Sequence, residues 1–93
     1  MHYRLTTMKF RADKRDAFLA YADSIRGEMK AITGIQSVVT VETAPGEAVV
    51  IASYDKMTNA MSAAPKVQKI MGGMAEFFVA PPIQLDGPQM WKM

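Results

Sequence analysis

Hydrophobic positions along the chain change their period several times, and each change marks a new element. Residues 2–10 alternate with a step of two but carry apolar side chains on both faces, which predicts a strand covered on both sides. In residues 14–32 apolar side chains recur at steps of three and four, which predicts one amphipathic helix. We expect Asp13 to cap this helix and Gly34 to end it.

A hairpin follows the predicted helix. Residues 35–43 and 47–54 are rich in β-branched side chains and flank Pro45-Gly46, a pair that is typical of a tight turn. Residues 48–52 are apolar without interruption, which favours a central strand with a layer on each side.

A broken helix and a last strand complete the pattern. Residues 56–63 predict a short helix, and Pro65 predicts the start of a second helix that runs to about Glu76. Residues 83–86 are extended, and the prolines around them place this segment at a sheet edge. The order βαββαβ predicts an α+β, ferredoxin-like fold with a four-stranded antiparallel sheet, as a single domain over residues 1–93.

Helices cover only one face of the sheet in such a fold. Strands that are apolar on both faces therefore predict a second copy of the chain on the other face. We expect a homodimer that meets through the sheet face and the C-terminal segment.

Composition excludes several classes of function. The net charge is only +2 and basic residues are interleaved with acidic ones, whereas nucleic-acid binding usually needs a concentrated basic stripe. No apolar run is long enough to span a bilayer, and the absence of cysteine favours the cytoplasm. Acidic residues and the single histidine are not grouped at metal-ligand spacing, and Gly72-Gly73 lacks the lysine of a phosphate loop.

Four local features carry a resemblance over nearly the whole chain. They are Gly34-Ile35 at the start of the second strand, the short Pro45-Gly46 hairpin, Ser53-Tyr54-Asp55-Lys56 before the broken helix, and Ala63-Ala64-Pro65-Lys66-Val67 where the helix restarts. With these features the chain resembles the dimeric α/β-barrel proteins, which include antibiotic-biosynthesis monooxygenases and stress-responsive barrel proteins. The resemblance implies two sheets packed face to face in a dimer, and a ligand cavity between helices and sheet in each subunit.

The same resemblance implies little about the reaction. Heme-degrading members hold iron with a histidine on the second helical region, whereas the only histidine here is His2 on the first strand, so no cofactor is expected. Cofactor-free members oxidise aromatic polyketides with the help of asparagine, tryptophan, tyrosine and arginine. This chain has Asn59, Trp91, Tyr21, Tyr54 and Arg4, none of which we match to the positions of that group. Tyr54 alone stands where many relatives end the third strand with an aromatic residue, commonly tryptophan, so it matches in kind but not in identity.

Two hypotheses about function remain open, and the sequence does not decide between them. In the first, the protein is a cofactor-independent monooxygenase-like enzyme that binds an apolar or aromatic small molecule; in the second, it is a non-enzymatic binding or stress-response dimer. The predicted ligand-binding residues are Tyr54, Tyr21, Asn59, Met61, Met71, Met74 and Arg4.

Each candidate also has a purely structural interpretation. Tyr54 and Tyr21 suit the core, Asn59 suits a helix cap, the methionines suit core filling, and Arg4 suits an ion pair with Glu42 or Glu47. His2 is expected to be partly exposed at a flexible start, and Trp91 to pack across the dimer.

Overall fold

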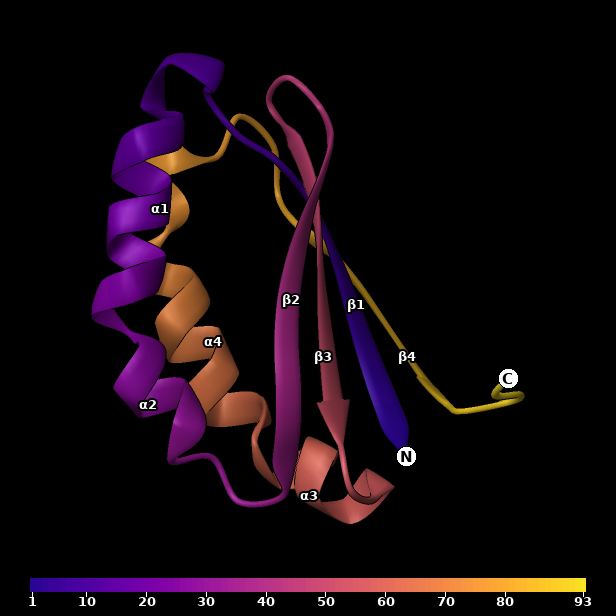
Figure 1. Cartoon of the computed structure of the whole chain (residues 1–93). Coiled ribbons are helices and arrows are strands. Elements are labelled where there is room, and N and C mark those ends of the chain that lie inside the picture. Colours follow the sequence, from indigo (N-terminus) through magenta and orange to yellow (C-terminus); the bar gives the residue numbers. More distant parts are fainter.

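Four antiparallel strands form one sheet in the computed structural model, which describes residues 1–93 (Figure 1). The strands are β1 (His2–Lys9), β2 (Ile35–Ala44), β3 (Glu47–Tyr54) and β4 (Ile83–Pro88). Their order is β2-β3-β1-β4, so the hairpin strands are neighbours and β1 pairs with both β3 and β4. The predicted ferredoxin-like fold is confirmed, with β3 inside the sheet and β4 at its edge.

The first helical region is divided into three pieces rather than one helix. It consists of η1 (Ala12–Lys14), α1 (Arg15–Ser24) and α2 (Arg26–Lys30). Ile25 separates α1 from α2 because its backbone, with φ −101° and ψ 4°, departs from helical geometry. The predicted cap is wrong: Asp13 lies inside η1 and makes no capping hydrogen bond, and its carboxylate is 3.8 Å from Arg11 Nε.

The second helical region breaks where the sequence predicts. It consists of α3 (Met57–Ser62), α4 (Ala64–Gly73) and η2 (Ala75–Phe77), with Pro65 in the first turn of α4. The helix ends earlier than predicted, because the Met74 N–H donates to the Met71 carbonyl and tightens the chain into a 3₁₀ turn.

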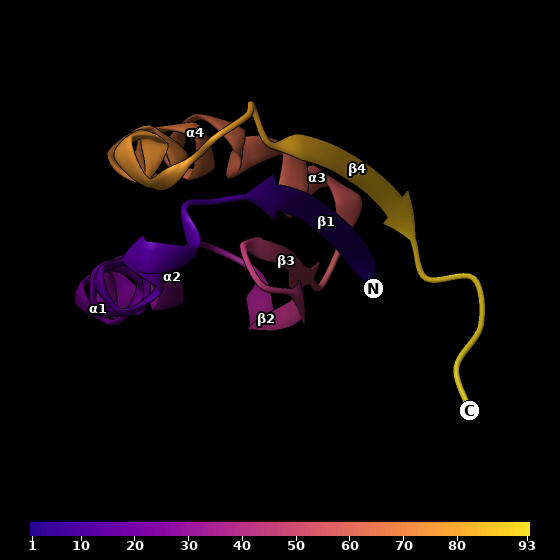
Figure 2. The same ribbon diagram turned by 90° about the horizontal axis from the view of Figure 1, so that it is seen from above.

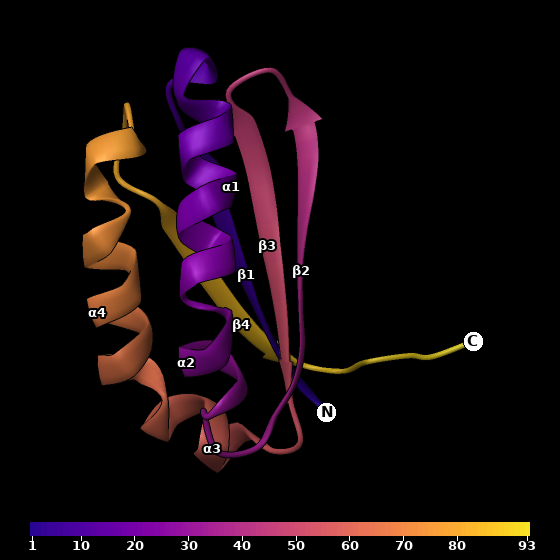
Figure 3. The same ribbon diagram turned by 60° about the vertical axis from the view of Figure 1, so that its left-hand side comes forward.

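The helices α1, α2 and α4 lie on one face of the sheet (Figure 2), and α3 lies at the end of the sheet beside β1 and β3 (Figure 1). The α1–α2 segment faces the half of the sheet formed by β2 and β3, and α4 faces the half formed by β1 and β4. Figure 3 shows the α1–α2 segment and α4 running alongside one another. Buried residues of this layer form two apolar clusters, one around Met8 and Phe18 and one around Ile32 and Tyr54.

The face of the sheet opposite the helices is uncovered and largely apolar. Alternate residues of each strand point to it, since neighbouring side chains of a strand lie on opposite faces. Its exposed apolar side chains are Leu5, Val39, Val41, Ile83 and Leu85. After β4, residues 89–93 extend away from the sheet (Figures 1 and 2).

Two glycines adopt a backbone conformation that other residues rarely reach. Gly46 has φ +79° in the hairpin turn, and its carbonyl accepts from the Phe10 N–H at 2.9 Å. Gly34 has φ +79° between α2 and β2, and its carbonyl accepts from the Asp55 N–H at 2.8 Å. The first bond joins the hairpin turn to the residue after β1, and the second joins the turn before β2 to the residue after β3. None of the helices is long and apolar enough to cross a membrane.

Candidate functional site

A cavity of about 100 Å³ lies between the helices and the sheet. Both apolar clusters contribute to its walls, together with Val38 from β2 and Val67 from α4. Most of the lining is apolar, and the few polar side chains are Arg4, Thr6, Thr40 and Tyr54. A ligand in this space would therefore be an apolar body held at a few polar positions.

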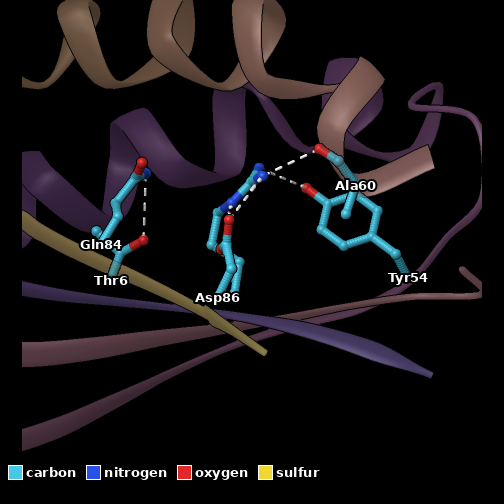
Figure 4. Close-up of polar contacts among 6 residues, drawn as sticks. Thr6, Tyr54, Ala60, Gln84 and Asp86 are labelled. Atoms are coloured by element: carbon cyan, nitrogen blue, oxygen red, sulfur yellow. Dashed lines mark hydrogen bonds and ion pairs between the residues drawn. The ribbon is translucent and has the colours of Figure 1, made fainter. Parts of the chain in front are cut away.

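Arg4 supplies a buried positive charge at this cavity. It projects from the central strand β1 toward the helices and is only 5% exposed. Its Nε donates to Asp86 Oδ1 at 2.9 Å and its Nη2 donates to the Ala60 carbonyl at 3.0 Å (Figure 4). Because a buried charge must be paired and hydrogen-bonded, Asp86 and Ala60 make this position tolerable.

Tyr54 is the other polar residue at this end of the cavity. Its side chain is 1% exposed, and the Arg4 Nη1 donates to its hydroxyl oxygen at 3.4 Å. Burial raises the pKa of the Tyr54 phenol above its ordinary value of 10.0, although the Arg4 guanidinium acts in the opposite direction. The phenol is thus neutral at physiological pH and keeps a proton that it can donate.

Two hydroxyls beside Arg4 already accept hydrogen bonds. The Tyr54 oxygen accepts from Arg4, and the Thr6 Oγ1 accepts from Gln84 Nε2 at 3.4 Å (Figure 4). Neither hydroxyl donates to an acceptor in the protein, so both retain a proton for a ligand. The polar groups of the lining are therefore suited to an oxygen that accepts hydrogen bonds, such as a carbonyl, enol or phenol oxygen.

The carboxylate that pairs with Arg4 is not one of the two that the sequence suggested. Glu42 accepts from Arg15 Nε at 3.0 Å, and Glu47 lies 3.9 Å from Lys9 Nζ. Both lie at the turn end of the hairpin, whereas Arg4 is directly opposite Asp86 on β4. That antiparallel pairing of the first and last strands is the one signal that could have identified Asp86 from the sequence.

The predicted ligand-binding residues divide into two groups. Arg4, Tyr54, Met71 and Met74 line the cavity. Tyr21, Asn59 and Met61 do not belong to its lining. The structure thus brings the first group together around one space, while the binding role of every member stays a prediction.

Each residue of the second group has a different environment. The Tyr21 hydroxyl donates to the Ile70 carbonyl at 3.1 Å and so joins α1 to α4. The Asn59 Nδ2 donates to Asp55 Oδ1 at 2.8 Å beside Gly34, and this amide makes no helix cap. Met61 is 62% exposed on α3, and Trp91 is 78% exposed after β4.

His2 differs from its predicted environment. It is a buried residue of β1, paired with Tyr54 on β3 and Pro88 on β4, and not a partly exposed one. Its Nδ1 is buried without a hydrogen-bond partner. The prediction was wrong because strand pairing on both sides fixes the chain from its second residue onward.

Sequence reasoning also missed most of the apolar lining. Met29, Ile32 and Ile35 enclose the cavity from the side of α2 and β2. Their helical and strand periodicity assigns them to the inner layer, but periodicity does not reveal that the inner layer leaves a space.

Comparisons with known proteins identify the fold. Neither models of protein families nor curated proteins give a match, whereas solved structures do. The chain is similar to the monooxygenase ActVA-Orf6 of Streptomyces coelicolor, solved in complex with nanaomycin D, at 11% identity and TM-score 0.81, over 99% of this chain and 89% of that one.

Two further structures agree with this result. Rv0793 of Mycobacterium tuberculosis matches at 19% identity and TM-score 0.77, over 98% of this chain and 96% of that one. A protein described as an antibiotic biosynthesis monooxygenase matches at 10% identity and TM-score 0.75, over 97% and 99% of the two chains. At these identities the likeness concerns the fold, so the chain has the ferredoxin-like fold of antibiotic-biosynthesis-monooxygenase-like proteins.

Proposed function

We propose that this protein binds a small apolar or aromatic molecule in the cavity and acts on it as a cofactor-independent monooxygenase-like enzyme of the cytoplasm. The observation that carries the proposal is an apolar space whose lining includes the hydrogen-bond donors Arg4, Thr6 and Tyr54. The monooxygenases among the structures of the same fold support it.

The size of the cavity limits the ligand. Its volume of about 100 Å³ is smaller than the roughly 150 Å³ of an engineered protein cavity that binds benzene. A single ring is therefore the largest body that fits after small side-chain movements. Met29, Met71 and Met74 in the wall are flexible enough to allow such movements.

A phenol with one ring is small enough for the cavity and carries an oxygen that accepts hydrogen bonds. Its oxygen would accept from Arg4 Nη1 and Tyr54, and its ring would lie against the apolar wall. Without a cofactor, the electrons that reduce O₂ must come from the substrate itself. A phenol can supply them, because one molecule of phenol and one of O₂ give a quinone and water in a balanced reaction.

The second candidate is a binding module without catalysis. It is favoured by the lining of the cavity, which contains no aspartate, glutamate or histidine to remove a proton from a ligand. The two candidates share the binding site and differ only in whether the bound molecule reacts.

We further propose that the protein works as a homodimer. The exposed apolar side chains of the open sheet face support this assembly, as does the C-terminal segment with exposed Met90, Trp91 and Met93. A second copy of the same chain is the partner best suited to a flat apolar face of this kind.

Binding of 4-fluorophenol and fluorobenzene, measured by fluorine NMR, tests the site. We expect wild-type protein to prefer the phenol, and Tyr54→Phe to lose about fivefold in phenol affinity, equivalent to one hydrogen bond of about 1 kcal/mol. Fluorobenzene affinity should not change. Tyr3→Phe is the matched control, because Tyr3 lies on the open face of the sheet.

Oxygen uptake with phenol as substrate separates the two candidates. Consumption of O₂ with appearance of quinone absorbance supports the enzyme, and saturable binding without O₂ consumption supports the binding module. If neither fluorinated probe binds at millimolar concentration, the cavity is not a ligand site and both candidates are contradicted.

A further inference from the structure

An open groove of about 480 Å³ lies on the outside of the same layer, between the α1–α2 segment and β2. Its rim is formed by exposed polar residues: Asp23, Arg26, Lys30, Gln36 and Ser37. We call it the α2–β2 groove. It lies at an edge of the sheet, because β2 has a neighbour only on the side of β3.

The α2–β2 groove and the cavity share a wall. Both are lined by the same set of side chains, namely Ala22, Met29, Ile35, Val38 and Thr40. Beyond that wall the cavity continues inward to buried Arg4 and Tyr54. The groove therefore lies against one part of the cavity wall, and the same side chains face both spaces.

Met29 is the movable part of this shared wall. Ile35, Val38 and Thr40 are β-branched residues on a strand and are stiff at χ1, and Ala22 has no side-chain torsion. Met29 has an unbranched, flexible side chain, and it is the only residue of α2 that is not exposed. A change of Met29 rotamer can therefore open the wall without moving the sheet.

The backbone around Met29 is lightly constrained. The helix α2 is five residues long and is separated from α1 by the irregular Ile25. Gly27 within it has nothing within 4 Å of the position that a Cβ would occupy. The free energy needed to displace a short helix with one inward side chain is smaller than that needed to displace the longer α1 or α4.

The charges along the groove favour a molecule that carries an electronegative oxygen. Arg26 is paired with Asp23 at 2.7 Å, whereas Lys30 makes no ion pair in the structure. Lys30 at the rim and Arg4 at the inner end thus place positive charge at both ends of the path.

We propose that ligands reach the cavity through the α2–β2 groove, and that Met29 is the gate residue that limits the size of the molecule admitted. This inference rests on the proposed binding function of the cavity. The α2–β2 groove would then be the route by which a ligand enters, and Met29 would control that entry. This surface is distinct from the open face of the sheet.

Fluorine NMR exchange measurements with fluorobenzene test the gate. Met29→Ala should raise both association and dissociation rates by about tenfold and should admit 1-fluoronaphthalene, which we expect the wild type to exclude. Met71→Ala is the matched control, because Met71 lines the cavity from α4 but does not line the groove. It should change affinity and leave the rates of access close to those of the wild type.

A second measurement does not depend on how the methionine variants fold. The chain has no cysteine, so a single cysteine can be labelled with a bulky maleimide. Labelled Gln36→Cys at the groove rim should slow probe exchange by about tenfold, whereas labelled Ser62→Cys on α3 should not.

The outcomes separate this inference from the function on which it rests. If the wild type binds no probe, the proposed function is contradicted and the gate with it. If the probe binds but labelled Gln36→Cys exchanges as fast as labelled Ser62→Cys, or Met29→Ala behaves as Met71→Ala does, only the gate is overturned.

Discussion

Tyr54 and Arg4 are buried together, and the protein stabilises the two side chains in opposite ways. The guanidinium keeps its charge because Asp86 and the Ala60 carbonyl accept its hydrogen bonds. The phenol instead stays neutral, because burial raises its pKa. A neutral donor beside a paired cation can orient a ligand oxygen without leaving an unpaired charge when the ligand departs.

The raised pKa of Tyr54 predicts a loss of stability at high pH. The folded protein holds the phenol proton more tightly than the unfolded chain, so this contribution is fully present below about pH 10.0 and is lost as pH rises through the higher folded value. Over that interval the free energy of unfolding should fall by up to about 1.4 kcal/mol per pH unit from this one proton.

Urea unfolding of wild type and Tyr54→Phe from pH 9 to 11.5 measures this effect. The variant should show a shallower decline, while Tyr3→Phe, which removes a phenol from the other face of the sheet, should follow the wild type. Equal slopes for wild type and Tyr54→Phe would show that burial does not hold the proton.

Single residues are also where sequence reasoning reached its limit. It selected Arg4 and Tyr54 as site candidates, since a charge on a strand and an aromatic residue at a strand end are visible in the chain. It did not find Asp86 or the burial of His2, because both depend on the pairing of β1 with strands far away in sequence. The pattern of residues within each segment does not show that β1 pairs with β3 and β4.

The helix α4 carries two adjacent glycines in contrasting surroundings. A Cβ on Gly72 would meet nothing within 4 Å, whereas a Cβ on Gly73 would lie 2.7 Å from Tyr21 Cζ and closer still to the Tyr21 hydroxyl. Gly73 therefore allows the close approach of α1 and α4, where Tyr21 donates to the Ile70 carbonyl.

Alanine at each position should give effects of opposite sign. Gly72→Ala should raise the free energy of unfolding by up to about 1 kcal/mol, from helix propensity alone. Gly73→Ala should lower it by about 1–3 kcal/mol, because Tyr21 must move and its hydrogen bond is lost. Denaturant melts of the two variants measure the difference, and equal stabilisation by both would show that Tyr21 is not held against α4.

Elements were predicted better than contacts. The hairpin around Pro45-Gly46 and the break before Pro65 arise from residues that restrict the backbone directly, and both are confirmed. The division at Ile25 was missed because no proline or capping residue marks it. The early end of α4 was missed although Gly72 and Gly73 are its last two residues. Sheet packing and a 3₁₀ turn decide those boundaries.

For the whole molecule, the open sheet face predicts association. At micromolar concentration, sedimentation equilibrium should give about twice the chain mass of 10.3 kDa. Leu85→Lys should yield a folded monomer, because Leu85 is 65% exposed in the single chain and a lysine there meets the partner only in the dimer.

Met57→Lys is the matched control for this experiment. Met57 is similarly exposed but belongs to α3, away from the open face, so the variant should remain dimeric. A wild-type protein that stays monomeric at these concentrations would contradict the proposed assembly.

The strand β4 connects this open face to the cavity. Leu85 points to the open face, and its neighbour Asp86 holds Arg4 on the helix side. An edge strand is the least constrained part of a sheet, so any contact that steadies β4 also steadies the guanidinium. Thermodynamic linkage is reciprocal. If dimerisation raises the affinity for a ligand by some factor, the ligand raises the affinity between the two chains by the same factor. Sedimentation with and without 4-fluorophenol measures that factor. If the proposed ligand binding and the proposed dimer both hold, adjacent residues of β4 would make the ligand affinity depend on the concentration of the protein.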